Sequence, residues 1–143
     1  MTATVLLPAG CLTARQRAKE AGEFPRNRVF EPGSVSEMPA GKDFLFAEFD
    51  RGGTQSVCLL MLAPGAELKK RYHADHDMTM FVVSGEAIVA VEETRYTVKP
   101  GSAVLLPRLT AYTVLVSPKT EKGFTALVVF SPPFDEKDTV LED

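Results

Sequence analysis

The sequence of 143 residues contains no tryptophan, only two cysteines and only two histidines. Cys11 and Cys58 are too few for the disulfide framework of a small secreted domain, so we expect a protein of the reducing cytoplasm. The first ten residues lack the basic stretch that opens a signal peptide. No apolar run approaches the ~18 residues of a membrane span, so we expect no membrane contact.

An excess of positive charge is also missing. The formal net charge is -3, whereas a nucleic-acid surface needs a basic stripe, so nucleic acid is not an expected partner. Hydrophobic residues make up 45% and charged residues 24% of the chain, which is the balance of an ordinary globular protein and excludes disorder or a coiled coil. A chain of this length is expected to form one domain with its own core.

One short helix is expected near the start of the chain. Thr13 and Gln16 have the spacing of a capping box, and Gly22 suits the position just past the helix end. Good helix formers fill the stretch Ala14–Ala21 between them. We therefore predict an N-terminal segment over residues 1–27 that contains this helix.

Short β-rich runs separated by glycine and proline fill the next part of the chain, residues 28–131. Their even spacing predicts a β-sandwich or barrel rather than alternating strands and helices. The acidic residues 132–143 are expected to form an extended or frayed tail. The predicted strands are Arg28–Phe30, Phe44–Phe49, Ser56–Leu62, Lys69–His73, Thr79–Val83, Ala87–Val91, Arg95–Val98, Ala103–Leu106, Ala111–Val116 and Phe124–Phe130.

Both histidines lie in one stretch, His73-Ala-Asp-His76-Asp77, at the end of a predicted strand. The residues around them follow regular intervals. Five residues separate Gly65 from Arg71, and one residue separates Arg71 from His73. Four residues then lead to Met78, and six more lead to Gly85. A second set runs from Gly101 over five residues to Pro107, then over one to Leu109 and over two to Tyr112.

These intervals resemble the two sequence motifs of the cupin superfamily, G-x5-H-x-H-x4-E-x6-G and G-x5-P-x-G-x2-H. The resemblance covers roughly residues 44–130 and keeps Gly65, His73, Gly85, Gly101 and Pro107 in register. It implies an all-β fold, the double-stranded β-helix or jelly-roll barrel, preceded here by the short helix.

The departures from these motifs concern the metal ligands. A metal-binding cupin takes two histidines and a glutamate from the first motif and a histidine from the second, and those positions here read Arg71, His73, Met78 and Tyr112. Arg71 keeps its proton and repels a cation, and the thioether of Met78 suits Mn, Fe(II) or Zn poorly. We therefore expect a degenerate metal site and no metal cofactor. A relocated site remains open, because Asp75, His76 and Asp77 could join His73 and Tyr112 as donors.

The resemblance places these four positions inside the barrel, and strand alternation adds further apolar residues to the interior. The expected ligand-binding residues are Arg71, His76, Met78, Met80 and Val114. A buried guanidinium requires an anionic partner, which Asp75, Glu48 or a ligand carboxylate could supply. His73 and Tyr112 form a candidate acid–base pair, because imidazole titrates near neutrality and a phenol can donate a proton.

Three functions remain open. The leading hypothesis is a metal-independent cupin that binds a small ligand with a carboxylate or carbonyl group and catalyses proton transfer, as in an isomerase, epimerase, cyclase or lyase. The second is a metal-dependent, dioxygenase-like enzyme with ligands around His73 and His76, and the third is a non-catalytic binding or sensor module. The resemblance also implies a homodimer, and the apolar segment Met1–Leu7 could cover a sheet edge in it.

Overall fold

The computed structural model of the chain describes residues 13–20, 29, 31–32 and 38–143. It divides into two compact units, Met1–Phe30 and Glu31–Asp143. Within the first unit, helix α1 spans Ala14–Glu20. The predicted capping box is present, because the amide of Gln16 donates to Oγ1 of Thr13 over 3.2 Å and the amide of Thr13 donates to Oε1 of Gln16 over 2.9 Å.

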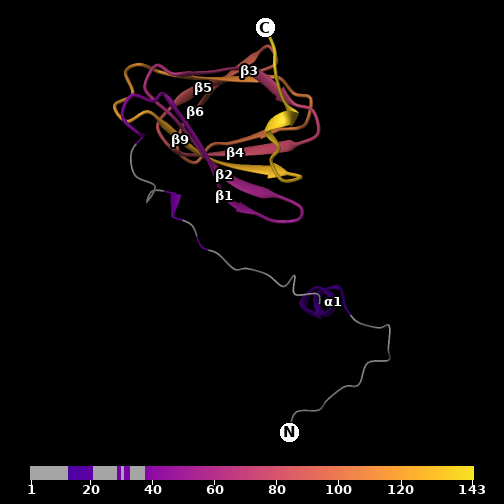
Figure 1. Cartoon of the computed structure of the whole chain (residues 1–143). Coiled ribbons are helices and arrows are strands. Elements are labelled where there is room, and N and C mark those ends of the chain that lie inside the picture. The colour runs from indigo at the N-terminus through magenta and orange to yellow at the C-terminus, as the bar shows by residue number, and fades with distance from the viewer. Residues whose placement is uncertain (1–12, 21–28, 30, 33–37) are drawn as a thin grey trace. The chain divides into compact units, whose positions relative to one another are not determined.

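The second unit is built from two five-stranded antiparallel sheets (Figure 1). One sheet has the order β1-β2-β9-β4-β7 and the other the order β10-β3-β8-β5-β6. The strands are β1 (Phe44–Arg51), β2 (Ser56–Leu62), β3 (Glu67–His73), β4 (Asp77–Ser84), β5 (Ala87–Val91), β6 (Thr94–Val98), β7 (Ala103–Leu106), β8 (Tyr112–Val116), β9 (Phe124–Ser131) and β10 (Thr139–Leu141).

The predicted barrel is confirmed, and the expected strands from β1 to β9 recur with ends that shift by a few residues. Of the strand predicted at Arg28–Phe30, only Val29 lies in the described part of the chain, and it is not in a strand. Gly22 and Met1–Leu7 lie outside the described residues as well. No helix among the described residues is long and apolar enough to cross a membrane.

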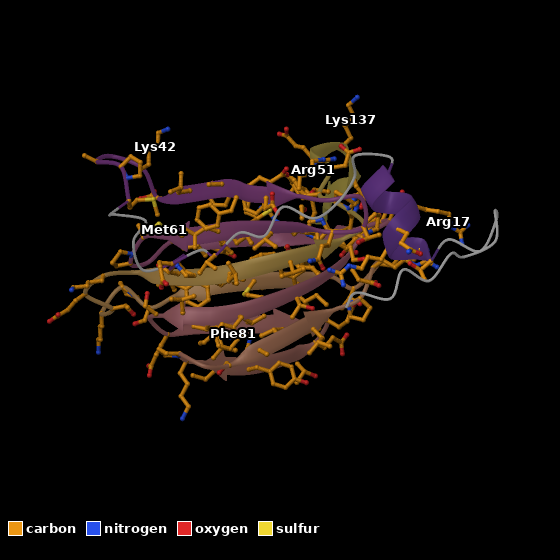
Figure 2. All side chains as sticks on the ribbon, turned by 90° about the horizontal axis from the view of Figure 1, so that it is seen from below. Arg17, Lys42, Arg51, Met61, Phe81 and Lys137 are labelled. Carbon is orange, nitrogen blue, oxygen red and sulfur yellow. The ribbon has the colours of Figure 1, made fainter. Side chains whose placement is uncertain are left out.

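The core lies between the two sheets and is formed by alternate residues of the strands. β4 shows this alternation, since Met78, Met80 and Val82 are buried while the residues between them are more exposed. On the outer face of the first sheet, Met61 and Phe81 project away from the core (Figure 2). Cys58 is fully buried, as predicted for a small apolar residue, and burial raises the pKa of its thiol to about 11.

Two glycines allow a close approach of two turns at one end of the barrel. Gly85, a glycine of the first motif, has a φ of 81°, and Gly123 has a φ of 76°. A Cβ atom added to Gly85 would overlap the carbonyl group of Gly123, and one added to Gly123 would overlap the carbonyl of Leu62. The turns after β4 and before β9 therefore meet at a spacing that only glycine permits.

The C-terminal residues, expected to be extended or frayed, are extended only in part and are not frayed. A 3-10 helix, η2 (Glu136–Asp138), follows β9, and β10 then pairs with the edge strand β3. The amide of Phe134 donates to Oγ of Ser56 over 2.7 Å, and its carbonyl accepts from Arg51 over 2.8 Å. We call residues 134–141 the C-terminal strap, because they follow β9 and add β10 to the edge of the second sheet.

Candidate functional site

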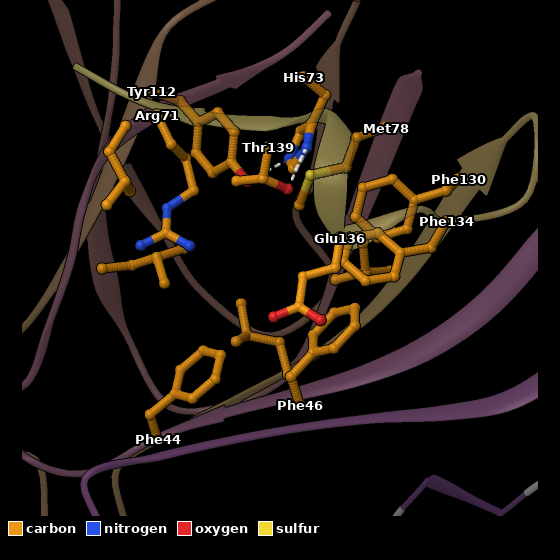
Figure 3. Close-up of a pocket in the computed structure, with 14 residues that line it drawn as sticks. Phe44, Phe46, Arg71, His73, Met78, Tyr112, Phe130, Phe134, Glu136 and Thr139 are labelled. Carbon is orange, nitrogen blue, oxygen red and sulfur yellow. Dashed lines mark hydrogen bonds between the residues drawn. The ribbon is translucent and has the colours of Figure 1, made fainter. Parts of the chain in front are cut away.

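A cavity of about 560 Å³ lies between the two sheets of the second unit (Figure 3). This volume is within the range of pockets that hold small organic molecules. Most of its lining is apolar or aromatic, and its polar members are two charged and three neutral side chains. The lining residues are Phe44, Phe46, Leu60, Leu68, Arg71, His73, Met78, Tyr112, Val128, Phe130, Phe134, Glu136, Thr139 and Leu141.

Strand β3 brings the polar residues of the site together. Arg71 and His73 are alternate residues of β3 and therefore share one face of the sheet. On one side of β3, Tyr112 of β8 lies opposite Arg71, and on the other side Thr139 of β10 lies opposite His73. Antiparallel pairing thus places all four side chains on one patch of the cavity wall.

His73 is buried and hydrogen-bonded through both nitrogens of its ring. Its Nε2 lies 2.9 Å from the hydroxyl of Tyr112, and its Nδ1 lies 3.2 Å from the hydroxyl of Thr139. Burial lowers its pKa and outweighs the negative charge of Asp138, which raises it. The nearby His76 and Arg71 lower it further, so that the pKa of His73 falls to about 4. The imidazole is therefore neutral at neutral pH.

Tyr112 keeps its proton. Its side chain is 2% exposed, and burial raises the pKa of the phenol well above its usual value of 10.0, against the opposing effect of the Arg71 charge. A neutral imidazole beside a protonated phenol, 2.9 Å apart, forms a pair that can accept and donate a proton. The structure brings His73 and Tyr112 within hydrogen-bond distance, and their role as an acid–base pair stays a prediction.

Arg71 presents its guanidinium to the cavity (Figure 3). Its Nε donates to the carbonyl of Lys69 over 2.9 Å. Neither Asp75 nor Glu48 is its partner, since Glu48 pairs with Arg51 at 3.3 Å. Within the described part of the chain Arg71 has no ion pair, and burial lowers its pKa.

The donor set at the four motif positions does not fit a divalent metal ion. The guanidinium of Arg71 and the thioether of Met78 lie in the same cavity as His73, whose two ring nitrogens already have hydroxyl partners. Among the residues that the structure describes, no group of three or more His, Cys, Asp or Glu side chains is arranged to hold a metal.

Three of the predicted ligand-binding residues lie elsewhere. Met80 and Val114 are fully buried in the core and do not line the cavity, because they sit deeper in the barrel along β4 and β8. His76 is directed at the strap, where its Nδ1 bonds the carboxylate of Asp138 and its Nε2 lies 2.7 Å from the carbonyl of Pro133. Both of its nitrogens are thus engaged outside the cavity, and the structure does not bring the two histidines together as joint metal ligands.

Sequence reasoning missed two sets of lining residues. Phe44 and Phe46 come from β1, which precedes the first motif, and the C-terminal strap contributes Phe134, Glu136, Thr139 and Leu141. The alternation in Phe44-Leu-Phe46 shows that the two phenylalanines share a face, but it does not indicate that this face lines a cavity.

Solved structures with the same architecture come from several organisms. KdgF from Halomonas sp. is 19% identical with a TM-score of 0.66, and the match covers 78% of this chain and 99% of that one. A double-stranded β-helix protein from Klebsiella pneumoniae is 18% identical with a TM-score of 0.68, covering 82% of this chain and 99% of that one. A single-residue variant of Streptomyces PAC13 with uridine is 11% identical with a TM-score of 0.63, covering 82% of this chain and 92% of that one. At these identities the likeness establishes the fold.

Sequence comparison gives the family itself. No curated protein matches the chain. The family model described as "Cupin domain" matches residues 58–130, which is more than half of the sequence. The match begins in β2 and ends in β9, so it contains both motifs and the cavity positions Arg71, His73, Met78 and Tyr112. The chain therefore belongs to the cupin domain family.

Proposed function

We propose that this protein binds a compact organic acid in the barrel cavity, with the ligand's anionic group on Arg71 and without a metal ion. The observation that carries the proposal is the guanidinium of Arg71, which faces an aromatic and apolar cavity and has no acidic partner among the described residues. Arg71 is half-buried, so its charge has lost part of its hydration, and a ligand carboxylate compensates for this through two parallel charge-assisted hydrogen bonds.

The rest of the lining favours an organic body over a free inorganic anion. Phe46, Phe130 and Phe134 pack around one another with ring centroids 4.8 to 6.1 Å apart and form one wall of the cavity. Such a wall gains free energy by burying apolar surface of a ligand, and the flexible Met78 can adapt to its shape. The Streptomyces PAC13 variant, which has a similar fold, was solved with uridine, an organic molecule.

Isothermal titration calorimetry with two matched probes tests this proposal. p-Toluate and p-toluamide have nearly the same shape, but only p-toluate carries a carboxylate. We expect the protein to bind p-toluate at least about tenfold more tightly than p-toluamide, since one bidentate ion pair in a partly buried site is worth ~1.4 kcal/mol or more. Arg71→Gln should remove this preference.

The control variant is Arg95→Gln, which changes an exposed arginine of β6 outside the cavity. It should keep the full preference for the carboxylate. Equal affinity for the two probes in the unmodified protein, or a preference that survives Arg71→Gln, would contradict the proposal.

A second candidate function is proton transfer on the bound ligand, and the His73–Tyr112 pair favours it. Neutral His73 would accept a proton from a carbon next to the ligand's carbonyl, and the protonated hydroxyl of Tyr112 would donate a hydrogen bond to the enolate oxygen that forms. Arg71 is one of the charges that lower the pKa of His73 after burial. A ligand carboxylate that neutralises Arg71 would therefore make His73 a stronger base when the ligand is present.

A further inference from the structure

The cavity contains a second charged side chain that the proposed function does not use. Glu136 belongs to the lining, and its carboxylate points into the cavity from the side of the C-terminal strap (Figure 3). Arg71 projects into the same space from β3. The cavity therefore presents one positive and one negative group to a ligand, and its formal charge from these two groups is balanced.

The position of Glu136 is fixed from both sides. It is the first residue of η2, whose preceding residue Asp135 accepts the amide of Lys137 over 3.0 Å. At the end of η2 the carboxylate of Asp138 accepts the amide of Asp75 over 2.9 Å and bonds the ring of His76. The turn that carries Glu136 is thus tied to the barrel beside the cavity.

Glu136 and Arg71 do not neutralise each other. Among the described residues neither forms an ion pair, and the carboxylate of Glu136 has no hydrogen-bond donor from the protein. Arg71 is half-buried and Glu136 is exposed, so both charges line the cavity and are open to a ligand. A guest with complementary groups at both positions would satisfy the two charges together.

We infer that Glu136 is a ligand-binding and specificity-determining residue, and that the ligand combines a carboxylate for Arg71 with an amino or hydroxyl donor for Glu136 on an apolar body. This inference rests on the proposed function for the place of the carboxylate and adds the second functional group. A simple monocarboxylate would make no bond with Glu136 and would bring a second negative charge into its neighbourhood. Glu136 therefore selects against such acids and in favour of bifunctional ones.

Calorimetry with p-(aminomethyl)benzoate and p-toluate tests the inference, because the two probes differ by one amino group. We expect the unmodified protein to bind p-(aminomethyl)benzoate about tenfold more tightly than p-toluate, the usual scale of one charge-assisted hydrogen bond. Glu136→Gln should weaken binding of p-(aminomethyl)benzoate and strengthen binding of p-toluate, since the substitution removes an attraction for the first probe and a repulsion for the second. This reversal cannot arise from a general loss of folding, which would weaken both.

Glu93→Gln serves as the matched control, because it removes the same charge from an exposed turn outside the cavity. It should leave both affinities unchanged. A preference for p-toluate in the unmodified protein, or a Glu136→Gln variant with an unchanged ratio, would overturn the inference while leaving Arg71 as an anion site. Failure of both probes to bind at millimolar concentration would overturn the inference together with the proposed function.

Discussion

The buried ring of His76 bonds the buried carboxylate of Asp138, a residue 62 positions further along the chain. Asp138 also accepts the backbone amide of Asp75 on both oxygens at 2.9 Å, and its own carbonyl accepts the amide of Ala74 over 3.2 Å. This contact joins the turn before β4 to the C-terminal strap. The strap forms one wall of the cavity, so the His76–Asp138 pair supports the site from outside it.

Removal of this pair should loosen the strap. We expect His76→Ala to lower the free energy of unfolding by about 2 kcal/mol, the usual range for a hydrogen bond to a charged group. Urea denaturation measures the change. Glu93→Ala is the control, because Glu93 lies in an exposed turn away from this contact, and it should have little effect. A His76→Ala variant as stable as the control would contradict a supporting role for the pair.

His76 should also make the protein less stable in alkaline solution. Burial disfavours its charged form, but hydrogen bonds with Asp138 and the carbonyl of Pro133 outweigh burial and raise its pKa above 6.5. A histidine whose pKa is raised by folding stabilises the folded state fully at a pH below its pKa in the unfolded chain. This stabilisation is lost as the pH rises through its pKa in the folded state. Unfolding free energies measured above pH 6.5 should therefore fall with pH, and this fall should be absent in His76→Ala.

His73 should have the opposite effect in acid solution, where it makes the free energy of unfolding rise with pH. Its pKa falls from 6.5 to about 4 on folding, so between these values the unfolded chain binds a proton that the folded chain does not. Stability should then rise with pH across this interval and level off above it. Denaturation of His73→Gln over the same interval should lack this rise, and an unchanged slope would show that His73 is not held neutral by the fold.

Proton transfer can be followed without knowledge of the natural ligand. Phenylpyruvate carries a carboxylate, a carbonyl group and exchangeable protons on the adjacent carbon. We expect the protein to accelerate exchange of these protons with D₂O, measured by NMR, and we expect His73→Ala and Tyr112→Phe each to return the rate to that of buffer. Both variants should remain folded by circular dichroism. Tight binding of phenylpyruvate with no acceleration would favour a binding module over an enzyme.

Removal of metal ions should change neither the thermal stability of the protein nor its affinity for the ligand. A metal bound to the folded state stabilises it by mass action, so its extraction lowers the thermal midpoint. We expect protein purified without a polyhistidine tag to keep both its midpoint and its affinity for p-toluate after dialysis against EDTA. A lower midpoint that is restored by iron, manganese, nickel or zinc, and abolished in His73→Ala, would support the metal-dependent alternative.

Local sequence signals are sufficient for most of the barrel. Glycine and proline between the β-rich runs mark where the strands end, whereas the proximity of Arg71, His73 and Tyr112 is implied only by the resemblance to the cupin motifs. The structure brings these three residues together on neighbouring strands. The capping box of Thr13 and Gln16 can also be predicted from the sequence, because it depends on two residues only three positions apart.

The strap cannot be predicted in this way. β10 is three residues long, too short for an alternation to be recognised, and it pairs with β3 across more than 60 positions. Asp138 and Glu136 read as part of an acidic tail, because their charge alone does not reveal that one bonds His76 and the other faces the cavity. Alternation wrongly places Met80 and Val114 at the cavity, because it gives the face of a residue but not its depth along the barrel.

The most direct test of this account is a crystal structure of the untagged protein grown with p-toluate. We predict that the carboxylate of the probe lies on the guanidinium of Arg71 with two parallel hydrogen bonds, and that its ring lies against Phe46 and Phe130. A transition-metal ion coordinated by His73 at the centre of the barrel, with the probe bound to it or absent, would contradict the central claim.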